Sequence, residues 1–173
     1  EQWLSGVEMF EIYGGEPFLS QQHFALLQRS IELGHSSKQV VHYNTNGTIF
    51  PEQAAVDIWP HFKSVDVMLS IDGIGEHFEY MRHPAKWAIV EDNIDKFVKA
   101  LPGKVMICLT VSIYNVYYLP KYLEYFEKKG LRVWLNMLYE PKKFSIRNLP
   151  DSAKRAVSEQ LSGKAFSCID EPL

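Results

Sequence analysis

The sequence predicts an α/β protein built on a mostly parallel sheet. Five strand-length apolar segments recur along the chain, and segments long enough for a helix separate them. Parallel strands need crossover connections of that length, which usually contain a helix. The sheet is either open or part of a barrel, and both arrangements place ligands at the carboxyl ends of the strands.

The first half of the chain predicts three strands and two helices. Residues 7–13 are apolar at both alternating positions, which indicates a strand buried on both faces. The next elements are expected to be a helix at 20–33, a strand at 39–43, a short helix at 51–59 and a strand at 65–71.

The second half begins with residues 74–84, which show no clear periodicity and are expected to be irregular. The following helix, at 85–100, is expected to turn Ile89, Ile94 and Phe97 toward a core. The remaining elements are expected to be a strand at 104–113, a helix at 118–129, a strand at 131–138 and a helix from 150 to about 161.

Composition limits the classes of protein that fit. The chain has 173 residues, 46% hydrophobic residues and a net charge of -3, which fit a single domain and disfavour nucleic acid or an anionic membrane as partners. No apolar run approaches the roughly 20 residues that span a bilayer, and no signal peptide is recognisable at residues 1–4. The two cysteines, Cys108 and Cys168, exclude a disulfide framework and favour a reducing, cytoplasmic setting.

The turn after the first strand carries the clearest chemical pattern. Gly14 and Gly15 allow positive φ and a close approach of the backbone to a ligand. Pro17 pushes Glu16 toward an extended conformation. A fixed carboxylate at the end of a parallel strand suits a small cationic group such as an amine. The alternative is an ordinary strand-to-helix turn with a solvated glutamate.

Polar residues follow the other strands as well. They form the segments Asn44–Gly47, Ser70–Gly73, Ser112–Asn115 and Leu138–Glu140. Taken one at a time, Asn46-Gly47 and Asp72-Gly73 are also common turn pairs, and Arg82 is also compatible with a surface cation.

In order and spacing, these strand ends resemble the radical SAM superfamily, particularly its SPASM or twitch branch. Gly14–Pro17 resembles the family's glycine-glycine-glutamate motif, and Thr45–Gly47 its third-strand motif. Ser70–Gly73, with Arg82 beyond it, resembles the fourth-strand segment, and Asn136–Pro141 the sixth-strand end. The resemblance implies a partial (βα) barrel of six units without its first unit. It further implies an incomplete core to about residue 140, and residues 141–173 as the start of a C-terminal extension.

The resemblance also implies roles in binding S-adenosylmethionine. Glu16, with the backbone of Gly14 and Gly15, would hold the amino group, and Ser70 and Arg82 would hold the carboxylate. A hydroxyl and a guanidinium are chemically suited to that second task. Asn46 and Asp72 would shape the pocket or contact the ribose, Leu138 would pack on the adenine, and Val111 would line the same wall.

The cluster-binding loop of the family is not found in these residues. Its Cys-x-x-x-Cys-x-x-Cys run binds a 4Fe-4S cluster and is expected before residue 1. Cys108 is interpreted as a small buried hydrophobe within a strand, and Cys168 as at most one ligand in a longer chain. No metal ligand or catalytic residue is therefore assigned. The chain alone is expected to be inactive, marginally stable or self-associating.

The predicted function is that of the central part of a radical SAM enzyme. The family cleaves S-adenosylmethionine reductively to a 5′-deoxyadenosyl radical, which abstracts hydrogen from a substrate, here expected to be a peptide, protein or small molecule. A flavodoxin or ferredoxin is the expected electron donor. A cluster-free nucleotide-binding or regulatory module is the alternative. An enzyme of phosphorylated metabolites is disfavoured by the lack of a phosphate-binding loop.

Overall fold

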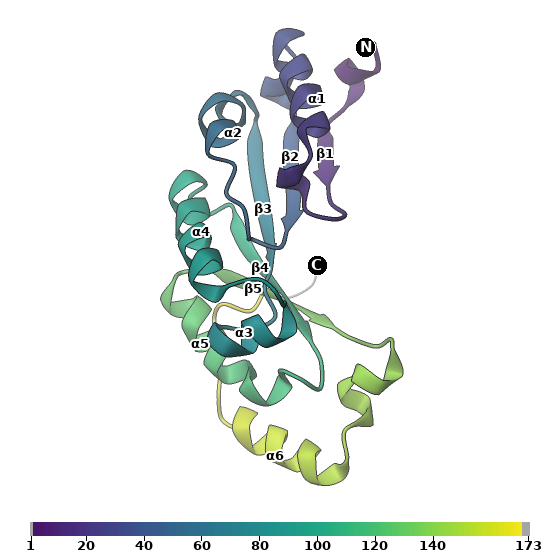
Figure 1. Ribbon diagram of the computed structural model, residues 1–173, viewed down its shortest axis with the longest axis vertical. Helices are drawn as coiled ribbons and strands as arrows, with labels where there is room; N and C mark the ends of the chain where they lie inside the picture. The colour runs from purple at the N-terminus through teal and green to yellow at the C-terminus, as the bar shows by residue number, and fades with distance from the viewer. Residues whose placement is uncertain (1, 171–173) are drawn as a thin grey trace. The chain divides into compact units, whose positions relative to one another are not determined.

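The computed structural model describes residues 2–170 and has an α/β architecture (Figure 1). Its strands are β1 (Met9–Ile12), β2 (Val40–Thr45), β3 (Ser64–Ser70), β4 (Val105–Val111) and β5 (Arg132–Met137). Its α-helices are α1 (Gln21–Glu32), α2 (Glu52–Asp57), α3 (Gly75–Met81), α4 (Trp87–Ala100), α5 (Leu119–Lys128) and α6 (Asp151–Leu161). The end of the predicted C-terminal extension, 171–173, lies outside the described residues.

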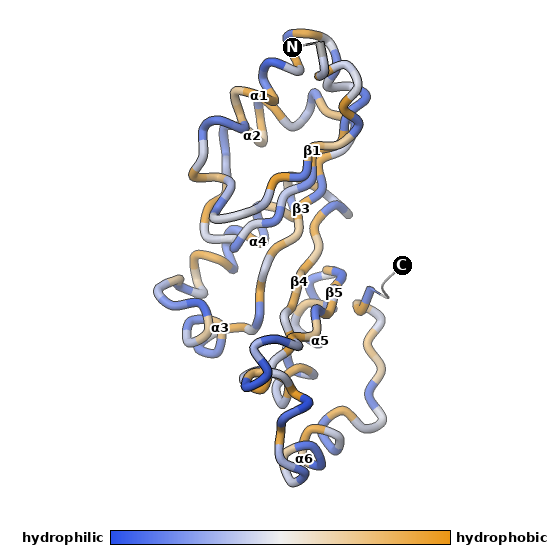
Figure 2. Tube along the Cα trace, turned by 90° about the vertical axis from the view of Figure 1, so that its right-hand side faces the viewer, coloured by the Kyte–Doolittle hydropathy of each residue, from blue (hydrophilic) through white to orange (hydrophobic). Residues whose placement is uncertain are grey.

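The sheet confirms the predicted fold class. Its five strands are ordered β1-β2-β3-β4-β5. The pairs β1–β2, β2–β3 and β4–β5 are parallel, with Phe10 opposite Val41 and Thr110 opposite Asn136. Figure 2 shows that β3 and β4 are mainly apolar, as the sequence predicted.

The chain divides into two compact units, which are described separately. The first comprises residues 1–69 and 88–105, and the second comprises residues 70–87 and 106–173. The first holds α1, α2, β1 and β2, with nearly all of α4 and β3. The second holds α3, α5 and α6 with β5 and nearly all of β4.

Aromatic packing dominates the core of the first unit. The ring of Phe18 lies 4.9 Å from Tyr43 of β2 and 5.8 Å from Phe97 of α4, measured between centroids. Trp59 contacts the same rings at 6.0 and 6.3 Å. Large buried rings contribute much of the apolar area that leaves water on folding. The turn after β1 is thereby fixed to β2, because Phe18 directly follows Pro17.

The core of the second unit forms between α5 and the strands β4 and β5. The buried side chains include Tyr122 and Phe126 of α5, Ile107 and Leu109 of β4, and Val133 of β5. The side chains that alternate with these along β4, including Cys108 and Thr110, are only half-buried. A strand places alternate side chains on opposite faces, so these residues share the open face of the sheet.

Three sequence-based expectations were wrong. The stretch 74–84, expected to be irregular, contains α3, a short helix whose single buried residue, Phe78, leaves almost no periodic signal. Ile89 is 54% exposed, because the buried positions of α4 run through Val90, Ile94 and Phe97. Met9 of β1 is 50% exposed, so this strand is not buried on both faces.

Cys108 also differs from its expected environment. It was interpreted as a buried hydrophobe, but its half-buried side chain lies on the open face, opposite the helix-covered face of Ile107 and Leu109. Cys168, in contrast, is buried, and its thiol lies 3.6 Å from the carbonyl oxygen of Leu123 in α5. Within residues 2–170, no helix is both long enough and apolar enough to span a bilayer.

The register of α4 predicts unequal effects of two identical truncations. Ile94→Ala removes a fully buried side chain and should lower the free energy of unfolding by about 2–5 kcal/mol. Ile89→Ala removes an exposed side chain and should change it by about 0.5 kcal/mol or less. Urea denaturation followed by circular dichroism measures both values, and equal losses would contradict the register.

Candidate functional site

The Gly-Gly-Glu turn in the first unit has the backbone geometry that its residues predict. Gly14 has φ +91° and Gly15 has φ +57°, values that side chains other than glycine's rarely permit. Glu16 is extended, with φ -117° and ψ 110°, as expected before proline. The turn therefore directs the Glu16 side chain to the end of the neighbouring strand, β2.

The Glu16 carboxylate accepts three hydrogen bonds. Its Oε1 accepts from the Thr45 hydroxyl at 2.7 Å and from the Phe18 N–H at 3.3 Å. Its Oε2 accepts from the backbone N–H of Asn46 at 2.9 Å. A carboxylate oxygen offers about two acceptor positions, so Oε2 retains one for a further donor. The structure thus brings together Glu16 and Asn46, two of the residues predicted to bind the cofactor.

Hydrogen bonds fix the loop after β2 at two neighbouring residues, Asn46 and Gly47. The Asn46 Oδ1 accepts from the Thr48 N–H at 2.8 Å and from the Thr48 hydroxyl at 2.6 Å. The Gly47 carbonyl accepts from the buried side chain of Asn93 in α4 at 2.9 Å. Sequence reasoning missed Asn93, although a polar residue on the buried side of an apolar helix is a signal for such a role.

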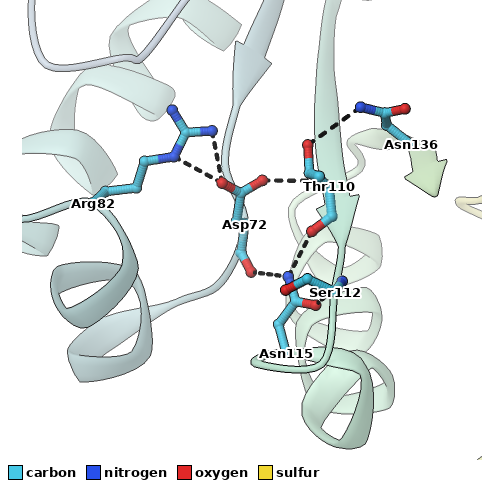
Figure 3. A network of polar contacts seen from close by, with 6 residues as sticks. All are labelled: Asp72, Arg82, Thr110, Ser112, Asn115 and Asn136. Carbon is cyan, nitrogen blue, oxygen red and sulfur yellow. Dashed lines mark hydrogen bonds and ion pairs between the residues drawn. The ribbon is translucent and has the colours of Figure 1, made fainter. Parts of the chain in front are cut away.

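In the second unit, Asp72 and Arg82 form an ion pair (Figure 3). Asp72 follows β3, and Arg82 stands directly after α3. The Arg82 Nε and Nη2 lie 2.8 and 2.7 Å from Asp72 Oδ2, while Asp72 Oδ1 accepts from the Thr110 N–H of β4 at 2.9 Å. The Arg82 Nη1 has no partner among the described residues and remains available as a donor.

Asn115 ties this cluster together and was not predicted individually (Figure 3). Its side-chain amide donates to the carbonyls of Asp72 and Thr110 at 2.9 and 2.7 Å, and its Oδ1 accepts from the Ser112 N–H at 2.8 Å. Asn115 is 1% exposed, so these bonds replace water. Only an amide supplies both donors and an acceptor in this way, which explains asparagine at this strand end.

A pocket of about 490 Å³ opens beside this cluster. That volume is typical of small-molecule sites, which range over about 300–1,000 Å³. Of the predicted site residues, Asp72 and Leu138 line it, whereas the Val111 side chain is buried on the other face and Ser70 is half-buried at the end of β3. The lining residues are Asp72, Tyr80, Met81, Thr110, Ser112, Tyr114, Asn115 and Leu138.

The described residues do not fit a metal cluster. No group of three or more His, Cys, Asp or Glu side chains suited to a metal ion occurs among residues 2–170. Burial raises the pKa of the Cys108 thiol, the charge of Asp72 raises it further, and Arg82 lowers it. Burial likewise raises the pKa of the Cys168 thiol. Both thiols are thus disfavoured as thiolates, the form that binds iron.

Comparison with known proteins gives matches of structure only. No family model and no curated protein sequence matches the chain. Native anSMEcpe with bound AdoMet and Cp18Cys peptide matches with a TM-score of 0.61 and 24% identity, over 78% of this chain and 40% of that chain. The form with AdoMet and Kp18Cys peptide matches with a TM-score of 0.64 and 22% identity, over 88% and 45%. The form with AdoMet alone gives 0.62 and 24%, over 80% and 41%.

Each of these solved structures has AdoMet bound. The chain shares their fold, an α/β fold that matches the partial barrel of the radical SAM type predicted from the resemblance. At identities below 25% the likeness is one of fold, and the chain spans less than half the length of these solved structures. The radical SAM fold agrees with the α/β class and strand direction predicted from the sequence.

The hydrogen bonds of Asn115 predict a large effect of its removal. Asn115→Ala leaves two carbonyl oxygens and one N–H without their buried partner, and should lower the free energy of unfolding by about 2–3 kcal/mol. Asn136→Ala is the matched control, because Asn136 is exposed and makes one long bond of 3.4 Å to Thr110. It should change stability by about 0.5 kcal/mol or less in urea denaturation. Equal effects would show that Asn115 does not hold the cluster.

Proposed function

We propose that this chain is the central part of a radical SAM enzyme and binds S-adenosylmethionine at its strand ends. The observation that carries the proposal is the Glu16 carboxylate, which is fixed by three hydrogen bonds and retains one acceptor position. The radical SAM fold and the AdoMet bound in anSMEcpe support it. The radical reaction and its substrate belong to the proposal as well.

Glu16 is suited to the amino group of the cofactor. An ammonium group needs a negative acceptor with a free lone pair in a fixed direction. The bonds from Thr45 and Asn46 hold the carboxylate in one orientation before any ligand arrives, which lowers the entropy cost of binding. Glu16 is also only half-buried, so a ligand can reach it.

The second unit offers matching features for the rest of the molecule. Arg82 keeps donors at Nη1 that suit a carboxylate, and Asp72 fixes the position of its guanidinium. Leu138 provides an apolar surface for the adenine in the pocket, and the half-buried hydroxyl of Ser70 is a further donor.

When bound, S-adenosylmethionine supplies a sulfonium centre for reductive cleavage. The tasks of this chain's residues are to bind and orient that ligand. The described residues do not fit an iron–sulfur cluster, so no step through such a cluster is derived from them. We propose that the longer protein takes electrons from a flavodoxin or ferredoxin and removes hydrogen from a peptide, protein or small molecule.

Titration calorimetry with S-adenosylmethionine tests the proposal. Glu16→Gln removes the negative charge but keeps the shape, and should weaken binding by about tenfold or more. Arg82→Ala should weaken it to a similar degree through loss of the carboxylate donor. Glu11→Gln and Arg132→Ala are matched controls at exposed positions outside both clusters, and should leave the affinity unchanged. Unchanged affinity in the Glu16 and Arg82 variants would refute the site.

A further inference from the structure

Two cations stand on aromatic rings in the segment that follows β5. The Arg147 guanidinium carbon lies 4.5 Å from the centroid of the Tyr139 ring, and the Lys143 Nζ lies 4.9 Å from that of the Phe144 ring. Cation–π attraction fixes such side chains and leaves their outward N–H donors free. We call Lys143 and Arg147 the basic rim.

The basic rim is attached to the wall of the 490 Å³ pocket. The Phe144 carbonyl accepts from the Ile113 N–H at 3.0 Å, and the Phe144 ring lies 5.5 Å from the ring of Tyr114, which lines the pocket. Tyr139 directly follows Leu138, another lining residue. The ring under Lys143 therefore contacts a residue of the pocket wall, and the ring under Arg147 belongs to the residue that follows another one in sequence.

The charge of the basic rim is not neutralised within residues 2–170. Neither Lys143 nor Arg147 forms an ion pair with a carboxylate there. The nearest acids in sequence, Glu140 for Lys143 and Asp151 for Arg147, are both exposed, and Glu140 accepts from the backbone N–H of Lys142 at 3.1 Å. An anionic ligand beside the pocket would meet two fixed cations, which attract it over roughly a Debye length of 8–10 Å.

The surroundings favour carboxylates over phosphate. Phosphate sites are commonly built from free backbone N–H groups. Beside this pocket the N–H groups of residues 112–116 are all engaged, with acceptors on Asn115, Phe144 and Ser112. Recognition of an anion must come from side chains at this wall. Two separate cations match carboxylates spaced along a flexible chain better than one compact phosphate.

The surroundings also favour a peptide over nucleic acid. Single-stranded nucleic acid binds largely by stacking bases on free aromatic faces. The rings of Tyr139 and Phe144 each carry a cation on one face. Tyr80 and Tyr114, which are 76% and 48% exposed, contact each other edge-on at 6.4 Å and offer apolar surface for peptide side chains.

We propose that the basic rim and the adjoining pocket wall form a substrate subsite for an acidic peptide, whose Asp or Glu side chains pair with Lys143 and Arg147. The inference rests on the proposed function, since it places a substrate beside the cofactor pocket. It adds the chemical class of that substrate, which the fold alone does not give.

Fluorescence anisotropy with a labelled Gly-Glu repeat peptide at low ionic strength tests the subsite. The double variant Lys143→Gln/Arg147→Gln should weaken binding of this peptide about tenfold, because two exposed cations are lost. The double variant Lys154→Gln/Arg155→Gln removes the same charge from exposed positions of α6 and should change binding by less than about twofold. A labelled Gly-Gln repeat peptide, which carries no charged side chains, should not bind the wild type or either double variant measurably.

Other results would overturn the inference in recognisable ways. Equal losses in both double variants would indicate a response to net charge alone. Competition by inorganic phosphate, or tighter binding of labelled oligothymidine through the same residues, would replace the acidic peptide by another class of ligand. The rim variant should keep its affinity for S-adenosylmethionine in calorimetry. If wild type does not bind that cofactor yet binds the Gly-Glu peptide through the rim, the proposed function fails and the subsite remains.

Discussion

In each unit of this protein a carboxylate that follows one strand accepts a hydrogen bond from the backbone of the next parallel strand. Glu16 follows β1 and accepts from Asn46 at the end of β2, and Asp72 follows β3 and accepts from Thr110 of β4. A hydrogen bond to a charged group contributes roughly 1.5–3 kcal/mol. These bonds fix the polar strand ends, on which every functional assignment here depends.

The same bonds decide what the carboxylates can do. Glu16 uses three acceptor positions for hydrogen bonds within the protein and keeps one free, so its carboxylate is fixed in place and can accept from one further donor. Asp72 also accepts three bonds, one from Thr110 at Oδ1 and two from Arg82 at Oδ2, and so orients the guanidinium. Glu16 is thus suited to contact a ligand directly, whereas Asp72 also positions a second group that can do so.

The parallel sheet and the Gly14–Glu16 turn were predictable from the sequence, because glycine, proline and strand periodicity determine the conformation of the backbone near them. The positive φ of Gly14 and Gly15 and the extended Glu16 follow from residue types alone, as does the parallel sheet from the spacing of its strands. Asn93 and Asn115 were not predicted, because their partners lie 46 and 43 residues away in sequence. The half-buried Cys108 was missed because alternation fixes two faces of a strand without indicating which one the helices cover.

The central claim is that the Glu16 carboxylate receives the amino group of S-adenosylmethionine. Heteronuclear NMR of the ¹⁵N-labelled protein tests it directly, since the backbone amide of Asn46 donates to Glu16 and reports on that carboxylate. During titration with the cofactor, the Asn46 amide resonance should shift along a saturating curve. An Asn46 resonance that stays unchanged at saturating cofactor would contradict the claim.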